Sequence, residues 1–319
     1  MSIAAAQPTL ELHTQEFVDS LAGAPPIYTL SLVDARSVLA QAQSIPVGKP
    51  SAQTEDIALP VGPTGSVPIR VIRPVGATEV LPVVMYFHGG GWVLGDRDTH
   101  DRLVREIAVG AQAAVVFVDY ARAPEARYPV AIEQAYAATR YVADNAAELG
   151  IDPLRLAVAG DSVGGNMAAA VTLIAKQRRG PNIAFQLLFY PVTDSGFDTP
   201  SYNQFADGPW LTKRAMEWFW DAYLPDPAVP KQPTATPLNA SVDQLTSLPE
   251  ALVIVDENDV LRDEGEAYAR KLSDAGVRVI SVRYNGTIHD FVMLNALADT
   301  PATRGAIAQA VGALRRALG

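Results

Sequence analysis

The sequence Gly-Asp-Ser-Val-Gly at residues 160–164 is the most informative stretch of the chain. We expect the apolar run before it, residues 154–159, to form a buried strand, and the alanine-rich residues 166–176 to form a helix. A serine between two glycines at a strand-to-helix corner is typical of a nucleophile elbow, a sharp turn that exposes the hydroxyl. The start of the helix behind it favours developing negative charge. Ser162 is therefore the candidate nucleophile.

A second motif, His-Gly-Gly-Gly-Trp at residues 88–92, follows the apolar, strand-like residues 83–87. A glycine tripeptide lets backbone N–H groups approach a ligand without side chains in the way. Lipases and esterases of the α/β-hydrolase type use such a loop after their third strand as half of the oxyanion hole, and the amide after the nucleophile, here Val163, supplies the other half. A flexible turn is the alternative, but the downstream Ser162 favours an oxyanion loop.

The base follows by elimination. In this fold the triad occurs in the chain order Ser, Asp or Glu, His. Only one histidine follows Ser162, so His289 is the candidate base. We expect residues 277–284 to form a strand that ends at residues 285–286, with His289 in the loop before a C-terminal helix at residues 303–318. The histidines of the chain are His13, His88, His100 and His289.

The residues alone narrow the triad acid to two candidates. The strand-like run 251–255 is followed by Asp256, Glu257 and Asp259. A triad acid should lie just beyond the carboxyl end of a strand, beside the histidine loop. Both Asp256 and Asp259 satisfy this condition, and at least two of the three acids must be ordinary loop carboxylates.

Five stretches resemble, in order and spacing, the hormone-sensitive-lipase-like branch of the α/β-hydrolases, which includes bacterial carboxylesterases. The resemblance implies that Asp259 is the triad acid. It also implies that the amides of Gly90, Gly91 and Val163 form the oxyanion hole, with His88 and Gly89 supporting that loop. The matching stretches are residues 88–92 (HGGGW), 119–125 (DYARAPE), 160–166 (GDSVGGN), 259–265 (DVLRDEG) and 289–291 (HDF).

The resemblance implies a serine carboxylesterase that hydrolyses short- to medium-chain carboxylic esters through Ser162, Asp259 and His289 and an acyl-enzyme. An amidase or lactonase with the same triad is one alternative. A non-catalytic ligand-binding protein on this fold is another, but it would lack a triad residue. The glycine that usually follows the histidine is Asp290 here. Its carboxylate would raise the pKa of His289 if the two side chains approach.

The pattern of the chain predicts the architecture. Apolar runs alternate with helical ones from residue 81 onward, which implies βαβ units and a mostly parallel sheet. Residues 54–59 and 67–73 flank a Gly-Pro-Thr-Gly turn and predict an antiparallel hairpin at one edge. We therefore expect an α/β-hydrolase fold, with a mostly parallel central sheet flanked by helices and the site in loops at one edge of the sheet.

Two stretches do not fit the sheet. By resemblance, residues 1–50 would be the N-terminal helical part of a cap, and residues 51–319 the catalytic domain, within which residues 195–245 contribute to the cap. Residues 218–223 are rich in aromatic side chains. We interpret at least half of these aromatics as the buried face of a helix.

Composition excludes several functions. The 319 residues include no cysteine, which rules out disulfides and cysteine nucleophiles. The net charge is −10, and no basic cluster occurs beyond a helix end, which argues against nucleic acid as a partner. The sequence contains no P-loop and no GxGxxG motif after a strand, and no two histidines have the spacing of metal ligands. We therefore expect neither a cofactor nor a metal. No apolar run is long enough to span a bilayer, and no basic leader is apparent. We expect a cytoplasmic protein without membrane insertion that acts on a small-molecule ester, with a homodimer as the candidate assembly.

Overall fold

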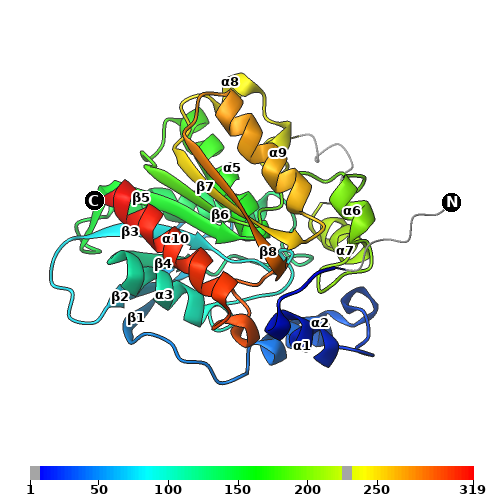
Figure 1. Cartoon of the computed structure of the whole chain (residues 1–319). Helices are drawn as coiled ribbons and strands as arrows, with labels where there is room; N and C mark the ends of the chain where they lie inside the picture. Colours follow the sequence, from blue (N-terminus) through cyan, green and yellow to red (C-terminus); the bar gives the residue numbers. More distant parts are fainter. Residues whose placement is uncertain (1–7, 225–231) are drawn as a thin grey trace.

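A computed structural model describes residues 8–224 and 232–319. In this part of the chain eight strands form one sheet, in the order β1-β2-β4-β3-β5-β6-β7-β8 (Figure 1). Strands β3 to β8 run parallel to one another. Strands β1 and β2 form the antiparallel hairpin predicted at one edge, and β2 also pairs antiparallel with β4. The strands are β1 (Ala52–Leu59), β2 (Val67–Pro74), β3 (Leu81–Phe87), β4 (Ala114–Val118), β5 (Ile151–Asp161), β6 (Phe185–Phe189), β7 (Glu250–Asn258) and β8 (Val279–Ile288).

Helices cover both faces of the sheet (Figure 1). Helices α3 and α10 pack against each other, and α4 packs on α5. Because both faces are covered, strands β3, β4 and β6 are buried along their whole length, which explains their continuous apolar sequences. The helices that flank the sheet are α3 (Asp101–Ala111), α4 (Val130–Asp144), α5 (Val163–Arg178), α9 (Arg262–Asp274) and α10 (Pro301–Leu318).

The remaining helices lie around the carboxyl edge of the parallel strands or in short connections. Helices α1 and α2 are at one end of the molecule, and α6 and α7 lie beside them (Figure 1). No described helix combines the length and the apolar character needed to cross a membrane. These elements are α1 (Leu12–Ser20), α2 (Leu32–Ala42), α6 (Pro200–Gln204), α7 (Lys213–Tyr223), α8 (Val242–Leu245) and the 3₁₀ helices η1 (Ile27–Thr29), η3 (Pro237–Asn239) and η4 (Asn295–Leu297).

Two sequence-predicted boundaries are wrong. Helix α5 begins at Val163 rather than at residue 166, directly after the serine of the elbow. Strand β8 does not end at residues 285–286 and continues to Ile288. The Asn-Gly pair lies inside an irregular part of the strand, where Gly286 has a φ of +74° and its N–H donates to Glu257 Oε2 at 2.7 Å. The turn-forming Asn-Gly pair is thus accommodated as an irregularity in the pairing of β8 with β7.

The expected cap segments are largely helical. Residues 1–7 and 225–231 belong to these segments in the sequence-based prediction and lie outside the described residues. In α7, Phe219, Trp220 and Tyr223 are buried, in agreement with the interpretation of the aromatic run as a buried helix face, and Trp218 is half-buried. Two of them cover Trp92, whose ring centroid lies 4.0 Å from that of Tyr223 and 4.8 Å from that of Trp220.

Candidate active site

Ser162 lies at a strained corner between β5 and α5. Its φ and ψ are +55° and −121°, a conformation that non-glycine residues rarely adopt. A Cβ atom at Gly164 would overlap the carbonyl oxygen of Phe87 at the end of β3, and one at Gly160 would overlap the backbone of Gly164. The two glycines of the motif are therefore required for the helix to start against the sheet, as a nucleophile elbow needs.

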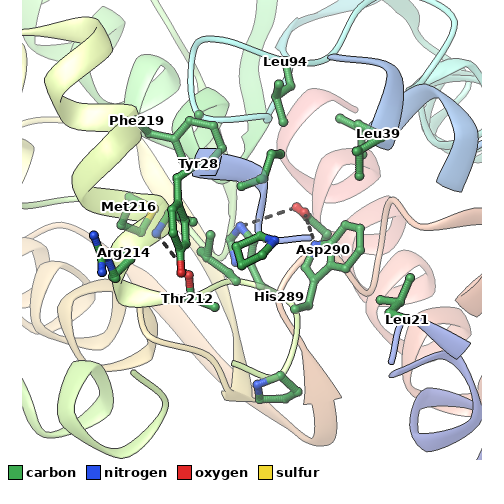
Figure 2. A pocket seen from close by; sticks show the side chains of 18 of the residues that line it. Leu21, Tyr28, Leu39, Leu94, Thr212, Arg214, Met216, Phe219, His289 and Asp290 are labelled. Carbon is green, nitrogen blue, oxygen red and sulfur yellow. Dashed lines mark hydrogen bonds and ion pairs between the residues drawn. The ribbon is translucent and has the colours of Figure 1, made fainter. Parts of the chain in front are cut away.

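His289 follows the last residue of β8, and its side chain lines the pocket shown in Figure 2. Its Nε2 lies 2.9 Å from Ser162 Oγ, and its Nδ1 lies 2.8 Å from Asp259 Oδ2. A carboxylate can only accept a hydrogen bond, so Nδ1 carries the proton and Nε2 is left to accept from the serine hydroxyl. All three side chains are buried, which strengthens the hydrogen bonds between them.

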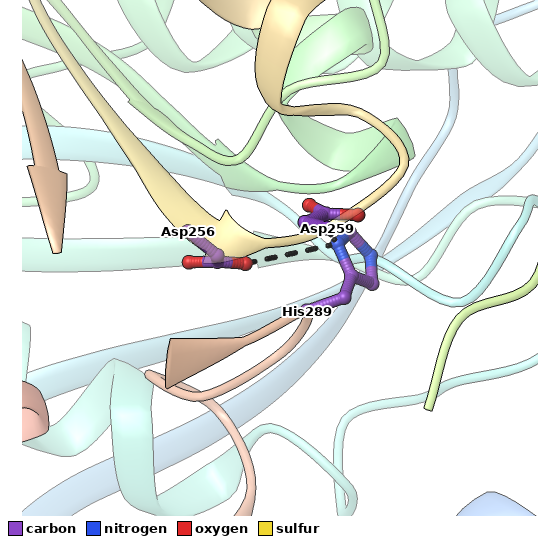
Figure 3. Close-up of side chains that lie close together, drawn as sticks. All are labelled: Asp256, Asp259 and His289. Carbon is purple, nitrogen blue, oxygen red and sulfur yellow. Dashed lines mark hydrogen bonds and ion pairs between the residues drawn. The ribbon is translucent and has the colours of Figure 1, made fainter. Parts of the chain in front are cut away.

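The structure separates the two candidate acids (Figure 3). Asp259 is bonded to the histidine and also accepts from the Leu261 N–H at 3.0 Å. Asp256 Oδ2 lies 4.0 Å from His289 Nδ1, and neither of its carboxyl oxygens has a hydrogen-bond partner in the described chain. Burial, together with the charge of Asp259, raises the pKa of Asp256 well above its ordinary value. Of the two candidate acids, only Asp259 is hydrogen-bonded to the histidine in the described chain.

The glycine loop lies beside the serine. Gly90 and Gly91 adopt φ values of +102° and +63°, and a Cβ at Gly91 would overlap the ring of Phe219. In the described part of the chain, the amides of Gly90, Gly91 and Val163 donate no hydrogen bond to another group of the protein. All three therefore remain free to donate to an oxyanion.

His88 supports this loop from below. Its imidazole is stacked between Tyr120 and Phe117, with ring centroids 4.2 and 5.3 Å away. Burial, and the nearby imidazole of His100, lower the pKa of His88 to about 3, so it is neutral. Its Nδ1 donates to the carbonyl of Gly89 at 2.8 Å.

Asp161 is a functional residue that the sequence reasoning missed. This carboxylate is fully buried and accepts hydrogen bonds from the Gly89 N–H at 3.0 Å and the Tyr86 hydroxyl at 2.7 Å. His100 Nε2 lies 3.2 Å from its other oxygen. Burial alone would raise the pKa of Asp161, but His100 and the hydrogen bonds outweigh it and lower the pKa. Asp161 thus links the glycine loop, at Gly89, to strand β5, which ends directly before Ser162.

The pKa of His289 is set by opposing effects. Burial disfavours the imidazolium, but the negative charges of Asp259 and Asp290 outweigh it and raise the pKa of His289 to about 9. Asp290 Oδ1 lies 3.5 Å from His289 Nε2. The side chains do approach, so the sequence-based expectation of an upward shift is confirmed.

A pocket of about 440 Å³ opens above Ser162 (Figure 2). Its walls come from the N-terminal helices and from the segment that leads into α7, and its floor comes from the glycine loop and the catalytic side chains. The lining is mainly apolar, which suits an acyl chain or an apolar alcohol. Among the lining residues are Val18, Leu21, Tyr28, Leu39, Trp210, Met216 and Phe219.

One cluster of described residues brings ligand atoms close enough for a metal ion, namely Asp256, Asp259 and His289, within 4.8 Å of one another. Both ring nitrogens of His289 already have hydrogen-bond partners, Asp259 on one side and Ser162 on the other. The hydrogen bonds of His289 thus suit proton transfer through its two ring nitrogens rather than metal binding.

Comparison with known proteins agrees with this geometry. The model of an alpha/beta hydrolase fold family matches residues 84–293. The chain is 41% identical to carboxylesterase NlhH of Mycobacterium tuberculosis over 89% of each chain, and 36% identical to an ethyl acetate hydrolase of Pseudomonas putida over 85% of this chain and 86% of the relative.

A thermostable esterase from Pseudomonas putida ECU1011 has a solved structure that superposes with a TM-score of 0.96, at 52% identity, over 98% of this chain and 99% of the other. A fungal esterase from Rhizomucor miehei superposes with a TM-score of 0.91 at 39% identity, over 98% of this chain and 97% of the other. The chain therefore belongs to the hormone-sensitive-lipase-like family of the α/β-hydrolase fold and is a carboxylesterase.

Proposed function

We propose that Ser162, His289 and Asp259 are the catalytic triad of this carboxylesterase. The observation that carries the proposal is the unbroken hydrogen-bond chain from Ser162 Oγ through both nitrogens of His289 to Asp259 Oδ2. His289 Nε2 takes the proton of the serine hydroxyl as the oxygen attacks the ester carbonyl carbon. Asp259 keeps the other proton on Nδ1 and stabilises the imidazolium that forms.

The oxyanion of the tetrahedral intermediate accepts hydrogen bonds from the amides of Gly90, Gly91 and Val163, with His88 and Gly89 holding the loop in place. These donors are fixed before the reaction, so no reorganisation is needed when the charge develops. The imidazolium then gives its proton to the leaving alcohol oxygen, and the acyl group stays on Ser162. A water molecule repeats the sequence on the acyl-enzyme and releases the acid.

We also propose that the described parts of residues 1–50 and 195–245 form a cap over a site for short- to medium-chain esters. The support is that Leu21 and Leu39 from the first segment and Met216 from the second line the pocket of about 440 Å³. Arg36 joins the first segment to the catalytic domain, because its guanidinium donates to the carbonyls of Val93 and Ala123 at 2.9 and 3.1 Å. The cytoplasmic location and the homodimer stay predictions from the sequence.

Replacement of the nucleophile gives the first test. Ser162→Ala should lower kcat for 4-nitrophenyl butyrate by at least about 10³-fold, because the oxyanion hole and binding alone remain. Ser66→Ala, at an exposed serine between β1 and β2, is the matched control and should keep wild-type turnover. A Ser162→Ala enzyme with near-normal turnover would show that another group attacks the ester.

The two aspartates should differ sharply. Asp259→Asn should cost about 10⁴-fold in kcat, because an amide that donates to Nδ1 favours the wrong imidazole tautomer. Asp256→Asn should cost less than about tenfold, since the Asp256 carboxyl group makes no hydrogen bond to His289. Steady-state kinetics of both variants, with circular dichroism to check folding, decide the matter. The reverse ranking would assign the acid to Asp256.

The pH profile follows from the raised pKa of His289. Acylation needs the neutral imidazole, so kcat/KM should fall as the pH drops below the pKa of about 9. Asp290→Asn removes a charge that favours the imidazolium, and the acid limb should therefore move to lower pH. Profiles from pH 5.5 to 10, corrected for spontaneous hydrolysis, measure both. Identical limbs in the two enzymes would contradict the charge effect.

The cap is tested by chain-length preference. Leu21→Ala should lower kcat/KM for 4-nitrophenyl octanoate relative to acetate, by about fourfold for each substrate methylene that loses its contact. Leu12→Ala is the matched control, because Leu12 begins helix α1, which ends directly before Leu21, is 70% exposed and does not line the pocket. If both variants keep the wild-type ratio, the N-terminal segment does not cover the acyl chain.

A further inference from the structure

Asp290 places a carboxylate in the ester pocket that the reaction steps do not use. It follows His289 directly and has a φ of +68°, a left-handed conformation. Its side chain is 14% exposed and lines the same pocket as Ser162 (Figure 2). One carboxyl oxygen accepts a hydrogen bond from Trp210 Nε1 at 2.8 Å, and the other lies 3.5 Å from His289 Nε2.

The position of Asp290 relates it to the alcohol part of the ester. This step rests on the triad proposed above. His289 Nε2 delivers a proton to the leaving alcohol oxygen, so that oxygen must come within hydrogen-bond distance of Nε2. The Asp290 carboxylate lies beside the same nitrogen. A charge on the alcohol, a few bonds from its oxygen, therefore lies close to this carboxylate.

The other charged groups around the pocket are less able to act on this part of the substrate. Asp207 and Arg214 also line it, but both are exposed, and water screens them. The guanidinium of Arg214 lies over the ring of Tyr28, 5.2 Å from its centroid. Asp259 and Asp161 are buried behind the catalytic groups and are held by hydrogen bonds.

Trp210 keeps the Asp290 carboxylate in place. The indole N–H donates to it, and the indole ring lies against Phe17 of α1, with centroids 5.4 Å apart. Burial and the charge of Asp161 outweigh the imidazole of His289 and the hydrogen bond from Trp210, so the pKa of Asp290 lies above its ordinary value. The side chain is thus an oriented, largely desolvated acceptor that faces the substrate.

We propose that Asp290 determines the charge preference of the enzyme for the alcohol part of the ester. Esters of neutral and cationic alcohols are accepted, and esters whose alcohol carries a carboxylate are disfavoured. Two negative charges about 6 Å apart, at an effective dielectric constant of about 20–40, repel enough to reduce kcat/KM roughly tenfold to hundredfold. A cation at the same place gains from the same field.

Two matched pairs of acetate esters test the proposal at pH 8. The anion 4-acetoxybutanoate is compared with its methyl ester, and the cation acetylcholine with its neutral isostere 3,3-dimethylbutyl acetate. In the wild-type enzyme the anion should be at least about tenfold poorer in kcat/KM than its methyl ester. Asp290→Asn should raise the ratio of kcat/KM for the anion to kcat/KM for its methyl ester by about tenfold. It should lower the ratio of kcat/KM for acetylcholine to kcat/KM for 3,3-dimethylbutyl acetate. The amide oxygen of asparagine still accepts from Trp210, and asparagine tolerates the left-handed conformation.

The use of ratios within one variant removes any change in base strength at His289, because both esters of a pair use the same histidine. Asp207→Asn is the matched control, since it removes an equal charge from the exposed part of the pocket, and it should leave the ratios within about twofold. The Asp290 effect should also persist in 0.5 M salt, whereas a general effect of the net charge of −10 would fade.

The outcomes separate this inference from the triad. Ser162→Ala should lower the turnover of all four esters by at least about 10³-fold, and near-normal turnover of all of them would overturn the proposed triad. If Ser162→Ala is inactive and the anion ratio is the same in wild type and Asp290→Asn, the charge role of Asp290 is overturned and the triad stands. An equal change of the anion-to-methyl-ester ratio in Asp207→Asn would also overturn the charge role of Asp290.

Discussion

The site depends on one close approach, between the start of α5 and the end of β3. Gly164 lies so near the carbonyl oxygen of Phe87 that no side chain fits between them. This contact forces the chain through the strained conformation at Ser162, and it brings the glycine loop after β3 next to the amide of Val163. The proposed nucleophile and the proposed oxyanion donors therefore depend on the same steric constraint. The strain is maintained because the packing of strand, loop and helix leaves no room for relaxation.

A buried charge completes this arrangement. Asp161 accepts from the backbone of Gly89 and from Tyr86, and it pairs with His100 at the start of α3. A carboxylate without these partners would be costly in an apolar interior, and with them it ties three segments together. The oxyanion loop owes its fixed geometry to this carboxylate, although its glycines provide the space. Beneath it the stacked ring of His88 fills the core as a neutral group.

Local sequence predicted most of the fold and the central chemistry, because those features depend on short-range rules. The elbow, the glycine loop and the alternating runs each need particular residue types at fixed spacing, and His289 had no competitor downstream of Ser162. The identity of the acid needed the family resemblance, since Asp256 and Asp259 follow the same strand. Contacts between distant segments, such as His100 with Asp161 or Trp210 with Asp290, had no local signal. The continuation of β8 through Asn-Gly depended on a partner strand and could not be predicted from turn propensity.

The N-terminal segment has a consequence for how the chain folds as it is made. The Glu11 N–H donates to the carbonyl of Gly286 at 3.0 Å, and Gln43 Nε2 donates to the carbonyl of Met293 at 2.8 Å. Glu11 and Gln43 are thus synthesised about 250 residues before the partners that they contact. Until then the apolar side chains of α1 and α2 stay in solvent, where they are a target for chaperones and for aggregation. Contacts between segments so far apart in the sequence form slowly, so we expect the N-terminal segment to dock late in folding.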